Sequence, residues 1–133
     1  MIKRLGHVGV VVEDLDEWLK LYERVFGLKA RAIKEVKDEK VRVAFIPVGD
    51  GEIDLIQPLT HDSSFGEFLK NHGQGIHHIA LITDDIQVET DRMKAEGVAF
   101  DTEKPRLGAH GAWIIFTQPK TTGGITHELY AED

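Results

Sequence analysis

Each of two similar halves of this chain carries one histidine at the start of an apolar, β-branched run. His7 opens the first run, Leu5–Val12, and His78 opens the second run within Gly75–Ile82. Each half then continues with an acidic helix cap, a helical pattern that ends at a glycine, and a closing strand with one carboxylate. The two halves are offset by about 70 residues, far longer than a solenoid period, so the sequence predicts a duplicated module.

The carboxylates of the two closing strands are Asp54 and Glu128. Imidazole and carboxylate ligands suit a divalent ion such as Co, Zn, Ni, Mn or Mg, and this ligand set does not choose between these metals. Four protein ligands on a six-coordinate ion leave two positions for a bidentate substrate, which favours polarisation of a carbonyl beside a developing enolate. The leading hypothesis is a metal site formed by His7, Asp54, His78 and Glu128.

Alternation along each strand decides which neighbouring side chains can share this site, since successive side chains point to opposite faces. Gln57 has the opposite parity to Asp54 on the first closing strand. His77 and His78 also point to opposite sides, so at most one of them is a ligand, and alignment with His7 selects His78. A lone strand histidine is more often a structural or surface residue than a ligand, and Asp54 or Glu128 alone would be an exposed strand carboxylate about as often as a ligand. The repetition of both types in matching places favours the metal site.

The composition excludes several classes of protein. The chain has 133 residues, of which 41% are hydrophobic and 29% charged, as expected for one ordinary globular domain. Its net charge of −7 argues against a nucleic-acid partner. The lack of cysteine excludes disulfides and thiolate metal sites. We expect neither a membrane span nor a signal peptide, and therefore a cytoplasmic protein.

The pattern of apolar and turn residues predicts the same βαβββ order in both halves. The single domain 1–133 is expected to consist of module one (about 1–60), a linker helix (about 61–74) and module two (about 75–133). The expected strands are 5–12, 29–36, 41–48, 52–57, 76–83, 98–102, 112–118 and 125–131, and the expected module helices begin at caps Asp14 and Asp84 or Asp85. The order disfavours a doubly wound parallel sheet. The expected fold class is α+β, with the two modules in a pseudo-two-fold arrangement that forms a curled, barrel-like mixed sheet.

With these features the chain resembles the vicinal oxygen chelate superfamily, which includes glyoxalase I and extradiol dioxygenases, and within it the methylmalonyl-CoA epimerase family. The matching stretches are Gly6–Val10, Val43–Gly49, Ile53–Leu59, Asp62–Ser64, Gly73–Ala80, Asp84–Ile86, Gly108–Gly111 and Pro119–Leu129. The Gly-Ile-His-His-Ile-Ala stretch and the Pro-Lys…Gly-Gly…Glu-Leu ending are fairly specific, whereas the His-x-Gly opening is common across the superfamily.

The resemblance implies a divalent-metal isomerase that interconverts the (R) and (S) forms of the CoA thioester methylmalonyl-CoA. In the implied mechanism a base removes the C2 proton, the metal stabilises the enolate, and the proton returns from the opposite face. Such a reaction needs two acid–base groups, and Glu128 is the first candidate for one of them. The resemblance also leads us to expect a homodimer.

Two departures from the family pattern leave alternatives open. The family usually has Glu or Gln where Asp54 stands, so Asp54 must reach the metal by a backbone shift or through water, with Gln57 as the fallback ligand. Some members place a catalytic Glu where this chain has Arg42, so the second acid–base group is unassigned. Arg42 either binds a substrate carboxylate or a CoA phosphate or is a surface strand arginine. Two other functions fit the same fold: a glyoxalase-type lyase or isomerase acting on a thiol adduct, and a metal-free binding protein.

Overall fold

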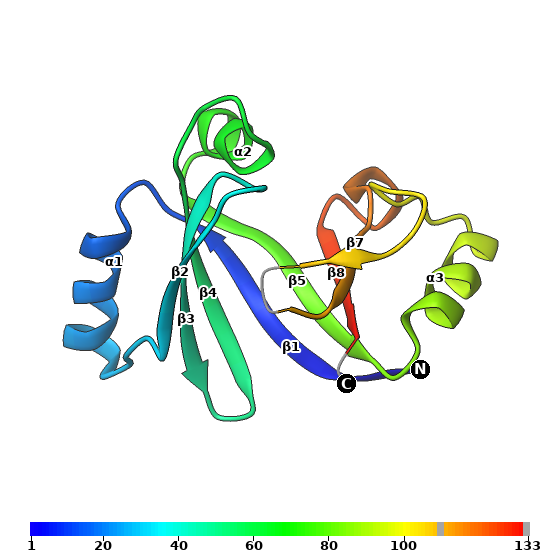
Figure 1. Cartoon of the computed structure of the whole chain (residues 1–133), viewed down its shortest axis with the longest axis horizontal. Helices are drawn as coiled ribbons and strands as arrows, with labels where there is room; N and C mark the ends of the chain where they lie inside the picture. Colours follow the sequence, from blue (N-terminus) through cyan, green and yellow to red (C-terminus); the bar gives the residue numbers. More distant parts are fainter. Residues whose placement is uncertain (109–110, 132–133) are drawn as a thin grey trace. The chain divides into compact units, whose positions relative to one another are not determined.

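The computed structural model describes residues 1–108 and 111–131, and the chain divides into two compact units (Figure 1). One unit is residues 7–77, and the other combines residues 1–6 with residues 78–133. Ala109 and His110 of the Gly108–Gly111 stretch lie outside the described residues. In the part of the chain that is described, no helix is both long and apolar enough to cross a membrane.

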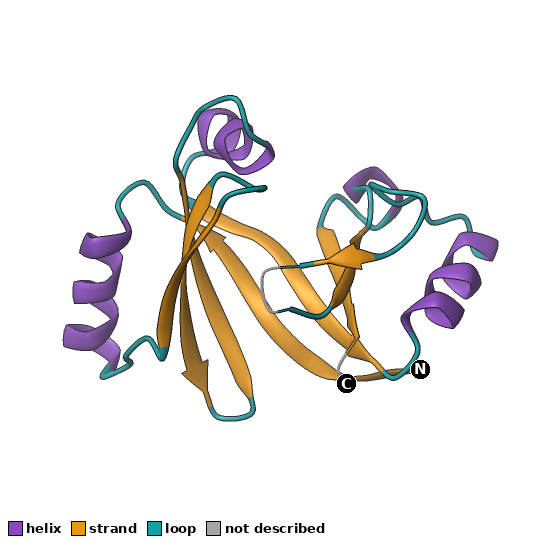
Figure 2. Cartoon of the chain, in the orientation of Figure 1, coloured by secondary structure: helices purple, strands orange, loops and turns teal. Residues whose placement is uncertain are grey.

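The strands form one mixed sheet of eight strands in the order β2-β3-β4-β1-β5-β8-β7-β6 (Figure 2). The elements are β1 (Ile2–Val11), α1 (Leu15–Leu21), η1 (Tyr22–Phe26), β2 (Ala32–Val36), β3 (Val41–Val48), β4 (Gly51–Pro58), α2 (Ser64–His72), β5 (Gly75–Thr83), α3 (Ile86–Ala95), β6 (Arg106–Leu107), β7 (Trp113–Phe116), η2 (Pro119–Thr121) and β8 (Thr126–Ala131). The first strand of each module is parallel to the last one, and the other pairs within a module are antiparallel. The predicted βαβββ order of both modules is confirmed.

In the 7–77 unit, helix α1 covers one face of the strands (Figure 1). The helix begins at Asp14, whose carboxylate accepts hydrogen bonds from two backbone N–H groups of the first turn. Its apolar side packs on side chains of β1, β3 and β4; the buried residues of this cluster are Val10, Val12, Leu15, Ala44, Ile46 and Leu55. Because side chains alternate along a strand, His7, Phe45 and Asp54 point to the face opposite α1.

The 78–133 unit repeats this separation of faces with helix α3. Asp85 caps α3 by accepting a hydrogen bond from a backbone N–H in the first turn. The buried residues on the α3 side are Phe100, Ile115 and Leu129, with Leu81 packed against them. The neighbouring positions His78, Phe116 and Glu128 therefore point to the other face. In both modules the face under the helix is apolar, and the other face carries the residues that could do chemistry together with further buried apolar side chains such as Val43 and Ile82.

The first helical pattern ends as predicted at Gly27, but its last part is wider than an α-helix. The five residues of η1 form a π-helix. Gly27 adopts a φ of 68°, in the left-handed region that glycine enters without steric cost. The Leu28 N–H donates to the Tyr22 carbonyl at 3.2 Å, which closes the helix end.

The prediction of a strand at 98–102 is wrong. Phe100 forms only an isolated bridge with Thr117, and the short strand of this module is β6 at 106–107. The Asp101 side chain is the reason, because its Oδ1 accepts the Phe116 N–H at 3.1 Å in place of a backbone carbonyl. Pro105 follows and has no N–H to donate to a ladder.

Glu89 of α3 gives this unit a pH-dependent contribution to stability. Its buried carboxylate accepts a hydrogen bond from Arg92 Nε at 2.9 Å, and this contact holds the pKa of Glu89 below its usual range. A lowered pKa in the folded state means that the contribution is present above the unfolded-state pKa and is lost as the pH falls through the folded-state pKa. We expect Glu89→Gln to lower the free energy of unfolding by about 2 kcal/mol at neutral pH.

The difference between wild type and Glu89→Gln should shrink in urea titrations below about pH 4. The exposed Glu67→Gln variant on α2 is the matched control and should differ little from wild type at either pH. An equal loss at neutral and acidic pH for Glu89→Gln would show that packing, rather than charge, is responsible.

Candidate metal site

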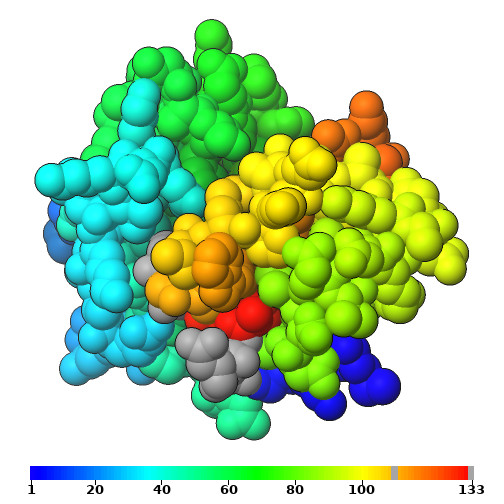
Figure 3. All heavy atoms as spheres, turned by 45° about the vertical axis from the view of Figure 1, so that its right-hand side comes forward, coloured from blue at the N-terminus to red at the C-terminus, as the bar shows by residue number. Residues whose placement is uncertain are grey.

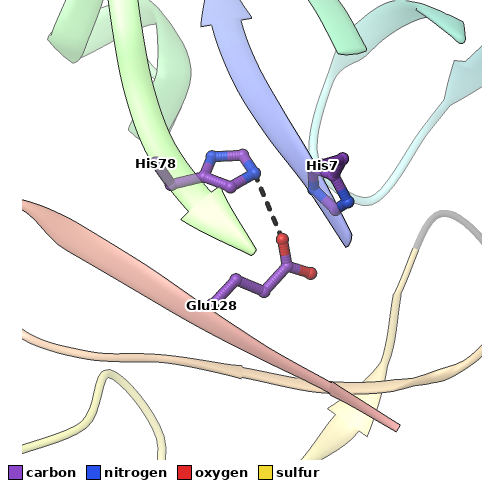
Figure 4. Close-up of side chains that lie close together, drawn as sticks. All are labelled: His7, His78 and Glu128. Carbon is purple, nitrogen blue, oxygen red and sulfur yellow. Dashed lines mark ion pairs between the residues drawn. The ribbon is translucent and has the colours of Figure 1, made fainter. Parts of the chain in front are cut away.

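His78 and Glu128 form a buried pair on the parallel strands β5 and β8. His78 Nε2 lies 3.1 Å from Glu128 Oε1, and the two side chains are 3% and 4% exposed (Figure 4). The residue opposite Glu128 in the strand register is Ala80, two positions after His78. The glutamate side chain therefore reaches along β5 past a small methyl group to meet the imidazole.

His7 and Asp54 form the corresponding pair in the 7–77 unit, on the parallel strands β1 and β4. Gly9, again two positions after the histidine, lies opposite Asp54 in the register. His7 Nε2 lies 3.6 Å from Asp54 Oδ2, and both side chains are buried. The longer distance is consistent with an aspartate that is one methylene shorter than the glutamate of the other module. The predicted duplication thus extends to the hydrogen-bonding register of the strands.

The donor types and spacings of these pairs fit a divalent ion. Metal–nitrogen and metal–oxygen bonds of about 2.1 Å keep neighbouring donors about 3 Å apart. The His78–Glu128 pair already has that spacing, whereas Asp54 would have to move closer to its histidine. Among the described residues, the metal-capable group consists of His7, His78 and Glu128, each buried and each offering one ligand atom (Figure 4). Asp54 is not in that group.

Burial makes a cationic partner for these carboxylates energetically important. Asp54 and Glu128 are each 3% exposed, and a carboxylate at such depth is costly unless charges and hydrogen bonds compensate it. A divalent ion would offer such a carboxylate both charge and a direct bond. The donor set therefore fits a bound cation.

The side chain of Gln57, the fallback ligand, forms a hydrogen bond with helix α1. Its Oε1 accepts the backbone N–H of Leu15 at 2.9 Å, so the amide caps the start of α1 from strand β4. This contact lies on the helix side of the strands, as the parity argument from the sequence predicts. The geometry favours Asp54 over Gln57 as the ligand candidate of β4.

Arg42 also points away from the ligand face. It shares its side of β3 with Ala44 and Ile46, which pack under α1. Its Nη2 lies 3.7 Å from Asp16 Oδ1 in the first turn of that helix, and the side chain is 33% exposed. Of the alternatives for Arg42, this placement favours the surface strand arginine.

Sequence reasoning missed two phenylalanines that adjoin the pairs. Phe45 lies opposite Asp54 in the β3–β4 register, and Phe116 lies opposite Glu128 in the β7–β8 register. An arginine guanidinium lies over each ring: Arg31 is 4.9 Å from the Phe45 centroid, and Arg106 is 5.4 Å from the Phe116 centroid. The sequence did contain a signal for these two residues, because Phe45 and Phe116 are as far apart in the chain as His7 and His78 are.

Comparison with known proteins assigns the chain to a family. Residues 6–116 match the Glyoxalase/Bleomycin resistance protein/Dioxygenase superfamily, and the chain belongs to it. The glyoxalase, or vicinal oxygen chelate, fold predicted from the sequence is thereby confirmed.

The resemblance to methylmalonyl-CoA epimerases is also confirmed. The ethylmalonyl-CoA/methylmalonyl-CoA epimerase of Cereibacter sphaeroides is 37% identical over 131 residues, which are 97% of this chain and 98% of that protein. The crystal structure of methylmalonyl-CoA epimerase from Mycobacterium tuberculosis has a TM-score of 0.93 at 30% identity, covering 99% of this chain and 89% of that one. A Streptomyces coelicolor methylmalonyl-CoA epimerase in complex with 2-nitronate-propionyl-CoA has a TM-score of 0.92 at 28% identity, covering 99% of both chains.

The choice between Asp54 and Gln57 can be tested with two substitutions on the same strand. Asp54→Asn removes the charge and should weaken Co²⁺ affinity about 10-fold or more, while Gln57→Ala should leave it unchanged. Gln57→Ala should instead lower the free energy of unfolding by about 1 kcal/mol, because the Leu15 N–H loses its acceptor. Competition with a chromogenic chelator and urea titration measure the two effects. The reverse pattern would make Gln57 the ligand.

The adjacent histidines of β5 provide a second test. His77 lies on the other side of the strand, where its ring packs against Phe65 and Phe68 with centroid distances of 4.7 and 4.9 Å. We expect His78→Ala to abolish metal retention and His77→Ala to preserve it, as measured by elemental analysis of the purified variants. Equal loss from both variants would contradict the assignment of His78 to the ligand face.

Proposed function

We propose that this protein is a methylmalonyl-CoA epimerase that uses a divalent metal held by His7, Asp54, His78 and Glu128. The observation that carries the proposal is the occurrence of one buried histidine–carboxylate pair in each module, in the same strand register. Membership of the superfamily and the 37% identity to an ethylmalonyl-CoA/methylmalonyl-CoA epimerase support it.

The substrate class follows from the chemistry that such a set of ligands favours. The C2 carbon of methylmalonyl-CoA lies between a thioester and a carboxylate, so two oxygens can bind side by side. A bound divalent ion would supply positive charge where the thioester oxygen gains negative charge. The protein would hold the two oxygens in one plane and so present the C2 proton in a fixed direction.

Glu128 is our candidate for one of the two acid–base groups. Glu128 is buried, so an uncompensated negative charge on its carboxylate would be unfavourable. His78 Nε2, 3.1 Å away, fixes the direction of Glu128 Oε1. In this scheme the carboxylate of Glu128 accepts the C2 proton from one face of the substrate. Arg42 is not our candidate for the group on the opposite face, because its side chain points toward α1.

The proposal includes a cytoplasmic homodimer, the assembly expected from the family resemblance. Light scattering coupled to size-exclusion chromatography measures the mass of the assembly directly. The chain mass is 14.9 kDa, so a monomer and a dimer are well separated in that measurement.

The decisive test is exchange of the C2 proton of methylmalonyl-CoA in deuterated water. We expect deuterium incorporation by the metal-loaded protein, loss of incorporation after EDTA treatment, and recovery when Co²⁺ or another divalent ion is added back. Mass spectrometry of the thioester measures the exchange. His77→Ala is the matched control and should retain it.

Absence of exchange with every one of Co²⁺, Zn²⁺, Ni²⁺, Mn²⁺ and Mg²⁺ would remove the epimerase assignment. Turnover of a glutathione hemithioacetal under the same conditions would then support a glyoxalase-type enzyme. Tight binding of a small molecule without turnover or metal would support a binding protein of the same fold.

A further inference from the structure

Three residues of the 78–133 unit form a closed set of contacts beside the His78–Glu128 pair. Asp101 donates its backbone N–H to the Phe116 carbonyl at 2.8 Å, and its Oδ1 accepts the Phe116 N–H at 3.1 Å. Its Oδ2 lies 3.0 Å from Arg106 Nη2. Arg106 in turn lies over the Phe116 ring. The same ion pair thus holds both the backbone and the ring of Phe116.

Phe116 connects this set to both members of the pair. Its ring meets the His78 imidazole edge to face, with centroids 5.2 Å apart and an interplanar angle of 85°. Its backbone lies directly opposite Glu128 in the β7–β8 register. An aromatic ring held perpendicular to an imidazole restricts rotation of that imidazole, so the position of Phe116 affects the direction in which His78 Nε2 points.

The 7–77 unit contains a similar arrangement built from different residues. Arg31 donates its backbone N–H to the Phe45 carbonyl at 2.8 Å and places its guanidinium over the Phe45 ring. Its Nε also donates to Glu52 Oε1 at 2.7 Å. Phe45 lies opposite Asp54 in the register. In this unit Arg31 alone makes both the backbone hydrogen bond to the phenylalanine and the contact with its ring. In the other unit Asp101 makes the backbone hydrogen bond and Arg106 makes the ring contact, so the two modules hold the phenylalanine with different residues.

We propose that Asp101 and Arg106 are positioning residues that hold Phe116 so that it orients His78 toward the bound metal. This inference rests on the proposed metal site. The ion pair lies at the surface, where residues 101–104 are exposed (yellow in Figure 3), and its side chains are 35% and 37% exposed. A surface ion pair contributes little to overall stability, so its loss should affect the metal site more than the fold.

The test compares Co²⁺ affinity, the visible spectrum of the Co²⁺-loaded protein and the melting temperature of the metal-free protein. Arg106→Met keeps the length of the side chain and removes its charge, and Phe116→Leu removes the ring. We expect both to weaken Co²⁺ binding about 10-fold, the range found when groups behind metal ligands are removed, and to change the Co²⁺ absorption bands. Arg106→Lys should recover part of the affinity, since it keeps the charge but not the planar guanidinium.

Two control variants separate positioning from general effects. Phe100→Leu makes the same substitution at a buried ring on the α3 side of this unit, and it should lower the melting temperature without changing Co²⁺ affinity. Lys104→Met removes an exposed cation from the same turn and should change neither quantity. If Phe116→Leu does not fold, Arg106→Met tests the inference alone.

The outcomes distinguish this inference from the proposed function. Wild-type protein that binds Co²⁺, together with Arg106→Met and Phe116→Leu variants that bind it equally well, would overturn the positioning role and leave the metal site standing. A raised KM for the thioester in Arg106→Met, with unchanged Co²⁺ affinity, would also overturn it, because Arg106 would then contact substrate. Wild-type protein that binds no divalent ion would overturn the proposed function and this inference with it.

Discussion

The alternation of side chains along parallel strands is the constraint on which this molecule depends. In each module a helix covers one face of the strands, and the positions beneath that helix are apolar, such as Leu55 in the first module and Leu129 in the second. The residues immediately before and after each of these leucines point to the other face, and Asp54 and Glu128 are the residues immediately before them. A shift of the register by one residue would move both carboxylates into the hydrophobic core, where no cation could compensate them.

The two histidine–carboxylate pairs show how the length of the acidic side chain changes the distance within the pair. The two modules place a carboxylate opposite a small residue, Gly9 or Ala80, and two positions away from the histidine. With glutamate the oxygen comes within 3.1 Å of the imidazole, and with aspartate it stays at 3.6 Å. Asp54 would therefore have to move closer to its histidine to share an ion with it, whereas Glu128 already has the spacing that two ligands of one ion need.

The sequence predicted most elements well because their signals are local. The Asp14 cap, the turn after Val48 and the glycine that ends the first helix all appear where the spacing indicated. The prediction failed at 98–102, where the apolar pattern alone suggested a strand. There the Asp101 carboxylate takes a hydrogen bond that a strand would have taken with its backbone, and no pattern of apolar residues reveals such a competition.

The sequence alone determined the duplication, the class of fold and the four residues with metal-capable side chains, because residue type and period are properties of the chain itself. Tertiary structure decided which oxygen faces which nitrogen, that Gln57 caps a helix, and that Arg42 faces α1. It also brought Arg106 over Phe116 and Phe116 against His78. These contacts join residues far apart in the chain, and their geometry depends on strand register and packing, which no local spacing specifies.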